Sequence, residues 1–511
     1  MADWSDGYVT EITYTHGYYH ELNPLRARWA LLLKGWAPPD VREACELGFG
    51  QGLSVNIHAA ASTVAWWGTD FNPAQVAHAQ RLAQAGGGRA RLFDDAFAEF
   101  GQRDGVPMFD FIGLHGIWSW VSRRNRELIV DFVRRHLRVG GVVYASYNTL
   151  PGWAAFAPVR HLMARHAETM TASGAGMAER IGAALAFVER VMGTQPQYAK
   201  AAPTVAGRVQ RLRQQSRAYL AHEYFNQDWE PMYFADIAQQ MSEAKLTWAA
   251  SAHLTDHVEP LNLTDAQRAL LRDIPDPVHR ETVRDVLVNQ QFRRDYWVKG
   301  AVPLGPDERR ALLRQQRVVL VVPRAQVRFK VTGTLGEADM APNIYGPVVD
   351  ALADHAVRAV EALEAAVAPA GVHFDQLVQA VTLLIATGQV HLVADHDPAV
   401  VRPGVAGLNQ ALVRRAFDGA DGGGWLASAV TGGAVSMGRF EQMFWALARQ
   451  GESDPQRWAR VVCEVLFSRN ERLVKDGKPL QSREEHLREL TERAQRYATT
   501  QEPIAAALAL G

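Results

Sequence analysis

Residues 46–52, Glu46-Leu47-Gly48-Phe49-Gly50-Gln51-Gly52, carry an acidic side chain followed by three glycines at alternate positions. They lie between an apolar run typical of a strand and a run with helical spacing. Glycines are required where a chain turns sharply off a strand and lets a ligand approach a helix N-terminus closely. The segment therefore predicts a loop that holds the nucleoside part of a cofactor.

The same spacing disfavours binding of a diphosphate. A dinucleotide loop of the G-x-G-x-x-G type needs a glycine where this chain has Leu53, and the Lys and Ser or Thr of a phosphate loop do not follow in register. An acidic residue two positions before the first glycine instead resembles the pattern of the class I S-adenosylmethionine-dependent methyltransferases, whose cofactor carries a cationic sulfonium. The cofactor-binding candidates in this loop are Glu46, Gly48, Phe49, Gly50 and Gly52.

A second acidic position follows the next strand-like run, residues 64–69. Asp70 comes 18 residues after Gly52. This interval is close to the roughly 20 residues at which doubly wound folds place a carboxylate on the ribose hydroxyls. Because one helix and one strand fill the interval, the sequence predicts Asp70 and its neighbour Phe71 at the ribose.

A third acidic position, here a pair of residues, ends the short strand-like run at residues 89–93, where related methyltransferases hold the adenine amino group. The residues are Asp94, Asp95 and Ala96, and Asp95 is favoured over Asp94. Taken singly, each acid also fits a helix N-cap. Three acids in the expected order, together with the glycine loop, predict that the chain binds S-adenosylmethionine and releases S-adenosylhomocysteine.

Residues 108–114 and 142–147 have the patterns of a fourth and a fifth strand. Parallel strands end at one edge of a sheet, so the residues that follow them face one crevice. The candidates to line an acceptor channel are His115, Trp118, Trp120, Tyr147, Asn148 and Trp153, and His115 is also a candidate cofactor contact. Plain packing is the alternative role for the three tryptophans among them.

Composition limits the class of protein. The chain has 511 residues, too many for one core, and its 54 basic and 55 acidic residues balance, so nucleic acid is not an expected partner. Cys45 and Cys463 lie far apart without metal-ligand spacing, which predicts no metal site and a reducing compartment. Since the sequence shows no secretory leader pattern and no run of about 18 apolar residues, we expect a cytoplasmic protein without a membrane span.

The pattern along the chain predicts an α/β fold with further modules. Residues 1–155 and 218–305 form a Rossmann-like class I methyltransferase core with a regulatory segment. Residues 156–217 form a helical insertion, a candidate surface for association of two copies. Residues 306–400 form a mixed α+β module whose helix at 374–387 and strand at 389–393 resemble a winged helix, and residues 401–511 are mainly helical.

Several segments resemble bacterial class I methyltransferases with a methyltransferase regulatory domain, a family that includes lysine methyltransferases acting on outer-membrane proteins. The resemblance covers roughly residues 40–300. Its segments are Phe109-Asp110-Phe111-Ile112, His115-Gly116-Ile117-Trp118-Ser119-Trp120-Val121, Ser146-Tyr147-Asn148-Thr149-Leu150-Pro151-Gly152-Trp153, Tyr219-Leu220-Ala221-His222-Glu223-Tyr224 and Gln290-Gln291-Phe292-Arg293-Arg294-Asp295.

The resemblance implies methyl transfer to a protein lysine. Methyl transfer from a sulfonium is an in-line displacement, and its rate depends mostly on the positioning of the acceptor against the methyl group. A lysine amine must first lose a proton. His115, Tyr147 and Asn148 are the catalytic candidates, and the further acceptor-binding candidates are Tyr18 and Tyr19 in an N-terminal lid, with His222 and Glu223. Two alternatives stay open: a saccharide or small-metabolite acceptor, or a non-catalytic protein that binds cofactor or serves as a scaffold.

Overall fold

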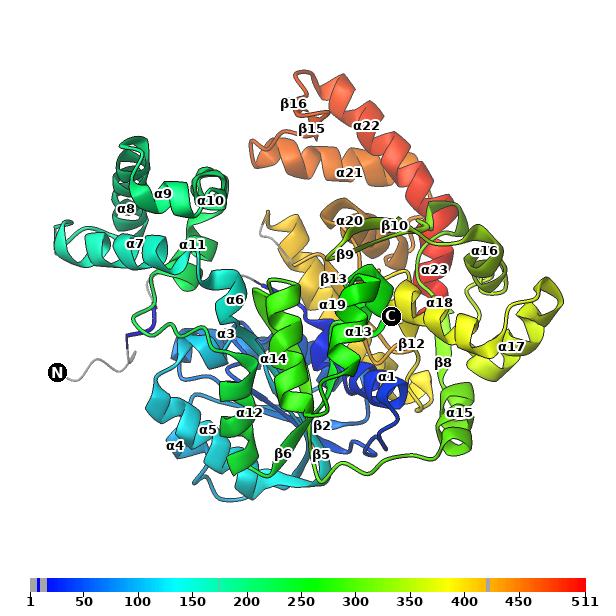
Figure 1. Ribbon diagram of the computed structural model, residues 1–511. Coiled ribbons are helices and arrows are strands. Elements are labelled where there is room, and N and C mark those ends of the chain that lie inside the picture. The colour runs from blue at the N-terminus through cyan, green and yellow to red at the C-terminus, as the bar shows by residue number, and fades with distance from the viewer. Residues whose placement is uncertain (1–6, 10–15, 173, 420–422) are drawn as a thin grey trace.

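A seven-stranded sheet lies at the centre of the computed structural model, which describes residues 7–9, 16–172, 174–419 and 423–511 (Figure 1). The strand order is β3-β2-β1-β4-β5-β7-β6, and β7 runs antiparallel to both of its neighbours. The strands are β1 (Glu43–Leu47), β2 (Ala65–Thr69), β3 (Ala90–Phe93), β4 (Phe109–Leu114), β5 (Leu137–Asn148), β6 (Leu246–Ser251) and β7 (Phe292–Lys299). The expected Rossmann-like core is confirmed. Its chain order reverses between β1 and β4, the place where doubly wound sheets bind ligands.

Helices cover both faces of this sheet. Side chains alternate between the faces along each strand, so Trp66 lies in one core and Trp67 in the other. One face packs against α1 (Pro24–Lys34), α2 (Leu53–Ala61) and α3 (Pro73–Ala85), and the other against α4 (Phe97–Phe100), α5 (Arg123–His136) and α12 (Phe234–Glu243). Asn72 caps α3 by accepting from Ala74 N, with Pro73 in the first turn.

The helical insertion follows β5 and projects from the sheet (Figure 1). It has its own hydrophobic core. Its helices are α6 (Leu150–Trp153), α7 (Ala157–Thr169), α8 (Met177–Gly193), α9 (Gln197–Ala201), α10 (Thr204–Leu212) and α11 (Arg217–Tyr224). It therefore starts and ends a few residues outside the expected 156–217. Association of two copies through this module stays a prediction.

The last strand of the sheet is shorter than the sequence pattern indicated. An apolar pattern from Asp285 to Gly300 suits a strand, but Asp285 belongs to α14 (Pro277–Leu287), which Asp276 caps. Asn289, with φ +49°, turns the chain before β7 begins at Phe292. Between β6 and α14 lie η3 (Leu254–His257), η4 (Glu259–Leu261) and α13 (Asp265–Arg272).

The middle module contains a three-stranded antiparallel sheet in the order β11-β8-β12. The helix expected at 374–387 and the strand expected at 389–393 are confirmed as α18 and β12, and β12 then leads into α19 (Pro398–Phe417). The elements are α15 (Pro306–Gln315), β8 (Arg317–Leu320), η5 (Arg324–Gln326), β9 (Lys330–Gly333), β10 (Gly336–Asp339), α16 (Pro342–Asp350), β11 (Arg358–Ala359), α17 (Val360–Val367), η6 (Ala368–Ala370), α18 (Phe374–Ala386) and β12 (Val390–Leu392).

The C-terminal module is mainly helical, as expected, with two small hairpins. Its α19 packs on α2 and α3, so one hydrophobic core runs from the C-terminal helices into α2. The elements after α19 are β13 (Trp425–Ser428), β14 (Gly433–Ser436), α20 (Arg439–Arg449), α21 (Pro455–Ser468), β15 (Val474–Lys475), β16 (Lys478–Pro479), α22 (Arg483–Arg496), η7 (Tyr497–Gln501) and α23 (Glu502–Ala507).

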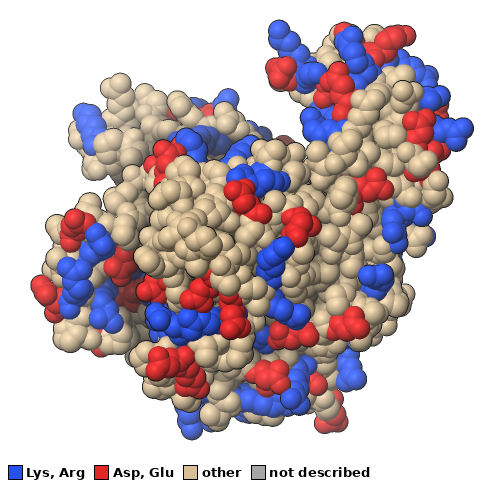
Figure 2. All heavy atoms as spheres, turned by 90° about the vertical axis from the view of Figure 1, so that its right-hand side faces the viewer, with Lys and Arg blue, Asp and Glu red and all other residues tan. Residues whose placement is uncertain are grey.

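Charged side chains of both signs are interspersed over the face shown in Figure 2. This mixture matches the balance of 54 basic and 55 acidic residues in the sequence. Within the described ranges, no helix combines the length and the apolar character that crossing a bilayer would require.

Candidate functional site

A cavity of about 280 Å³ opens at the carboxyl ends of β1, β2 and β4, where the strand order reverses. Its lining contains both residues that the sequence predicted and residues that it did not. The predicted lining residues are Gly48, Gly50, Asp70, Phe71, Asp95, Ala96, His115 and Trp120. The lining residues that were not candidates are Tyr8, Gln75, Phe97, Gly116, Ile117, Val121, Ser122, Asn125 and Asp228.

The glycine loop has the backbone conformation that its sequence indicated. Gly48, Gly50 and Gly52 have φ values of +70°, +58° and +72°, a region that other residues rarely adopt. The loop also leaves no room for side chains, because a Cβ on Gly48 would lie 2.3 Å from Ile117 Cδ1 and one on Gly52 2.4 Å from Ala79 Cβ. The loop therefore lets its surroundings approach the backbone closely.

Asp70 lies at the tip of β2 and fixes the glycine loop. Its Oδ2 accepts from Gly50 N at 2.8 Å and its Oδ1 from Asn72 N at 3.0 Å. Burial raises the pKa of Asp70 to about 7, although these two backbone donors favour the ionised form. One side chain thus joins the ends of β1 and β2.

Glu46 lies behind the loop and forms a buried acidic pair with Asp70. Burial, and then the charge of Asp70, raise the pKa of Glu46 to about 8. Among the residues that the structure describes, Glu46 Oε2 has no hydrogen-bond partner. Two adjacent buried carboxyl groups with an unpartnered oxygen favour a positively charged ligand, because a cation would stabilise their ionised forms.

The two acids after β3 have different environments. Asp95 lines the cavity and forms a two-pronged ion pair with Arg103, at 2.5 Å from Nε and 2.8 Å from Nη2. Asp94 is exposed and lies outside the lining. The pairing of Asp95 with Arg103, whose guanidinium also covers the Phe93 ring, is a structural feature that the sequence pattern did not indicate.

His115 follows β4 and stands between two aromatic rings. Its ring lies 3.5 Å from the Tyr19 ring centroid at an interplanar angle of 20°, and its Nδ1 is 2.8 Å from Tyr144 Oη. Burial lowers the pKa of His115 to about 4, which leaves the imidazole neutral near pH 7. The carboxylate of Glu21, paired with Arg294 at 3.3 Å, lies close enough to oppose this shift.

Several candidates lie outside the cavity lining. Tyr147 is fully buried and donates to Asp295 on β7, while Asn148 is buried and donates its backbone N–H to Ser119 Oγ. Trp118 is buried in the core that α5 covers, and Trp153 in the core of the helical insertion. Both tryptophans are therefore surrounded by core side chains, as the alternative packing role would have it.

The candidates on the N-terminal segment and on α11 also differ in their distance from the cavity. Tyr19 stacks on His115, whereas Tyr18 is buried with its Oη 3.0 Å from His58 Nε2. On α11, His222 is buried against Tyr8, with 5.6 Å between ring centroids, and burial raises the pKa of Glu223 to about 7. Tyr8, which lines the cavity, therefore links α11 to the site.

Comparisons with known proteins agree with this architecture. A family model described as a predicted methyltransferase regulatory domain matches residues 216–299. The Synechocystis protein sll1526 is 36% identical over 506 residues, which cover 98% of each chain. The Rickettsia prowazekii protein RP789 is 26% identical over 298 residues, covering 55% of this chain and 51% of that protein.

A solved structure has the same overall fold. It is PKMT2 from Rickettsia typhi in complex with AdoHcy, which superposes with a TM-score of 0.69 at 15% identity and covers 98% of this chain and 100% of that chain. The chain therefore belongs to one family with sll1526, carries at residues 216–299 a segment that matches the predicted methyltransferase regulatory domain, and has the fold of PKMT2.

Proposed function

We propose that the protein transfers a methyl group from S-adenosylmethionine to a protein amine, a lysine side chain. The observation that carries this proposal is the glycine loop with its buried acidic pair, Glu46 and Asp70, at the switch point of the sheet. When bound, S-adenosylmethionine supplies an electrophilic methyl group on a positively charged sulfur.

The residues present fit this cofactor. Each Asp70 oxygen accepts one backbone N–H, and a carboxylate offers about four acceptor sites, so capacity remains for the ribose hydroxyls. The unpartnered Glu46 Oε2 suits the ammonium of the amino-acid part. Asp95 and Ala96, with Phe97 beside them, would hold the adenine. The likeness to PKMT2 in complex with AdoHcy supports this assignment.

The charge of the cavity supports a cationic acceptor. Three carboxyl groups, those of Asp70, Asp95 and Asp228, line it; Arg103, outside the lining, pairs with Asp95, and none of the described lining residues is Lys or Arg. A lysine with a reference pKa near 10.4 arrives protonated and is attracted to such a wall. The low pKa of His115 makes it a weak base, so we assign it to orienting the acceptor while the proton leaves to water. The sequence resemblance to lysine-modifying members favours the same acceptor.

Calorimetric titration with S-adenosylmethionine and S-adenosylhomocysteine tests the cofactor assignment. The wild-type chain is expected to bind both, and Asp70→Ala to weaken both by about 10- to 100-fold, the loss expected for hydrogen bonds to a charged group. Asp94→Ala is the matched control, since Asp94 is exposed outside the lining. No binding by the wild-type chain would favour a scaffold, and unchanged affinity in Asp70→Ala would remove that residue from the ribose.

The acceptor is identified by incubating the protein with cell extract and radiolabelled S-adenosylmethionine. Label that survives acid hydrolysis as methylated lysine would support the proposed acceptor. Label recovered in saccharides or small metabolites would instead establish a hydroxyl or another small acceptor.

A further inference from the structure

The N-terminal segment at residues 16–23, here called the lid segment, forms part of the wall around His115. Tyr19 stacks on the His115 ring, and its backbone N–H donates to Ser54 Oγ on α2 at 3.0 Å. Two residues later, Glu21 pairs with Arg294 on β7. The lid segment thus supplies an aromatic and an acidic side chain beside the cofactor cavity.

The hairpin β13–β14 of the C-terminal module packs on the other side of the lid segment. The Trp425 ring centroid lies 5.4 Å from that of Tyr18 and 5.1 Å from that of His20. Asn23, which ends the segment, donates through Nδ2 to Gly432 O at 3.3 Å. The hairpin is about 400 residues from the lid segment in sequence, yet it forms its outer support.

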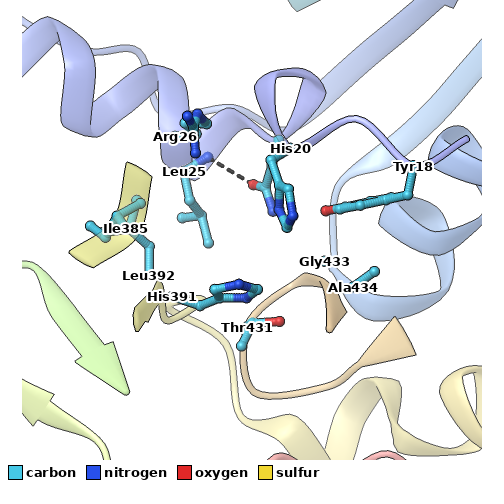
Figure 3. A pocket seen from close by; sticks show the side chains of 11 residues that line it. Tyr18, His20, Leu25, Arg26, Ile385, His391, Leu392, Thr431, Gly433 and Ala434 are labelled. Atoms are coloured by element: carbon cyan, nitrogen blue, oxygen red, sulfur yellow. Dashed lines mark hydrogen bonds between the residues drawn. The ribbon is translucent and has the colours of Figure 1, made fainter. Parts of the chain in front are cut away.

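The contact is closest at Gly433. A Cβ at this position would lie 2.5 Å from Tyr18 Oη and 2.7 Å from Asn23 Nδ2, both shorter than such atoms approach in proteins. Figure 3 shows Tyr18, His20 and His391 around a cavity of about 40 Å³, with Gly433 and Ala434 of the hairpin beside them. The lid segment, β12 and the hairpin therefore meet around this small cavity, and their closest approach lies at Gly433.

The geometry of the segment connects this contact to the active site. Tyr19 has an extended backbone, with φ −119° and ψ 108°, and neighbouring side chains of an extended chain point to opposite sides. Tyr18 accordingly faces His58 and the hairpin, while Tyr19 faces His115. A displacement of Tyr18 must move Tyr19, because one peptide unit joins them.

We propose that Tyr18 is a positioning residue, through which the C-terminal hairpin holds Tyr19 against His115 at the methyl-transfer site. This inference rests on the proposed methyltransferase function for its catalytic consequence. It assigns to the C-terminal module a direct part in shaping the acceptor side of the site, while the cofactor side depends on β1, β2 and their loops.

Three variants test the proposal in the full chain. Gly433→Ala places a methyl group against Tyr18 Oη, and Tyr18→Phe removes the hydroxyl that contacts His58 while it keeps the ring. Ser436→Ala is the control, because Ser436 lies on the same strand with an exposed side chain. Hydrogen exchange of residues 16–23, calorimetry with S-adenosylhomocysteine and the initial rate of methyl transfer are measured for each.

Gly433→Ala and Tyr18→Phe are expected to speed exchange in the lid segment at least fivefold and to slow methyl transfer at least fivefold. The dissociation constant of S-adenosylhomocysteine should stay within twofold, and Ser436→Ala should match the wild type in all three measurements. Unchanged exchange in Gly433→Ala, or faster exchange with an unchanged transfer rate, would overturn the proposal. If the wild-type chain transfers no methyl group, the proposed function fails, while the exchange data still report on the coupling of the hairpin to the lid segment.

Discussion

At the scale of single residues, the buried pair of Glu46 and Asp70 determines what the site can hold. Two carboxyl groups with pKa values raised to about 8 and about 7 are protonated or costly to ionise in the ligand-free protein. A cation removes that cost. The pair therefore couples the pH, the stability of the fold and the affinity for a positively charged ligand.

This coupling predicts opposite pH trends for stability and binding. Between the ordinary carboxyl range and pH 8, the unfolded chain releases protons that the folded pair retains, so the ligand-free protein loses stability as the pH rises. Binding of S-adenosylmethionine favours the ionised pair, so affinity should rise over the same range and level off above pH 8. Glu46→Gln should flatten both trends, with weaker binding and a higher unfolding temperature at pH 8.

Calorimetry from pH 6 to pH 9 and thermal unfolding at the same pH values check these trends. Asp94→Ala again serves as the control, because that side chain is exposed. An identical pH dependence in the wild type and in Glu46→Gln would contradict the role of the pair.

At the scale of elements, the pairing of β5 with β7 is stabilised by a buried ion cluster. The guanidinium of Arg293 contacts Asp295 at 2.7 Å, Asp285 at 2.6 Å and Glu281 at 3.0 Å, and only 4% of the Arg293 side chain is exposed. Tyr147 on β5 donates to the same Asp295. The cluster ties α14 and β7, which lie in the region matched by the regulatory-domain model, to β5.

Arg293→Met should destabilise the protein by about 3–5 kcal/mol, because it leaves buried carboxylates without their cation. Arg42→Met is the control: Arg42 pairs with Asp40 on the surface with side-chain exposures of 81% and 71%, and loss of such a pair costs about 0–1 kcal/mol. Urea unfolding measures both changes. Equal losses in the two variants would show that the cluster contributes no more than a surface pair.

At the scale of the whole molecule, glycines set the distance between the C-terminal module and the sheet. A Cβ on Gly404 would lie 2.8 Å from Gly86 O, and one on Gly407 2.2 Å from Ala85 O. Helix α19 therefore meets the end of α3 backbone to backbone. The position of the hairpin over the lid segment depends on this contact.

Gly407→Ala should force α19 away from α3 and lower the free energy of unfolding by about 1–3 kcal/mol, as overpacking does. Gly182→Ala on α8 is the matched helical control, since a Cβ at Gly182 would approach only Arg217 Nη2 outside its own helix, at 4.0 Å, and Ala should gain about 0.5–1 kcal/mol there. Thermal and urea unfolding distinguish the two. A neutral Gly407→Ala would contradict close docking.

The arrangement of the whole molecule also explains which residues of the site the sequence could predict. The glycine loop, Asp70 and His115 follow directly from strand ends, because local spacing fixes which residues lie at one edge of a sheet. Tyr8 and Asp228 reach the cavity from a separate segment and from the loop after α11, and no local pattern marks them. Trp118 and Trp153 follow strands and Tyr147 lies near the end of β5, but their side chains are buried in cores formed with packing partners far away in sequence.

The antiparallel strand β7 also has a consequence for synthesis on the ribosome. Strand β5 pairs with β4 as soon as it emerges, but its other edge waits for a partner about 140 residues later. At a translation rate of about 5–20 residues per second, that edge stays unpaired for roughly 7–30 s, long enough for wrong pairings with other chains. The helical insertion folds around its own core in that interval, so the nascent chain gains structure beside the open edge before β7 closes it.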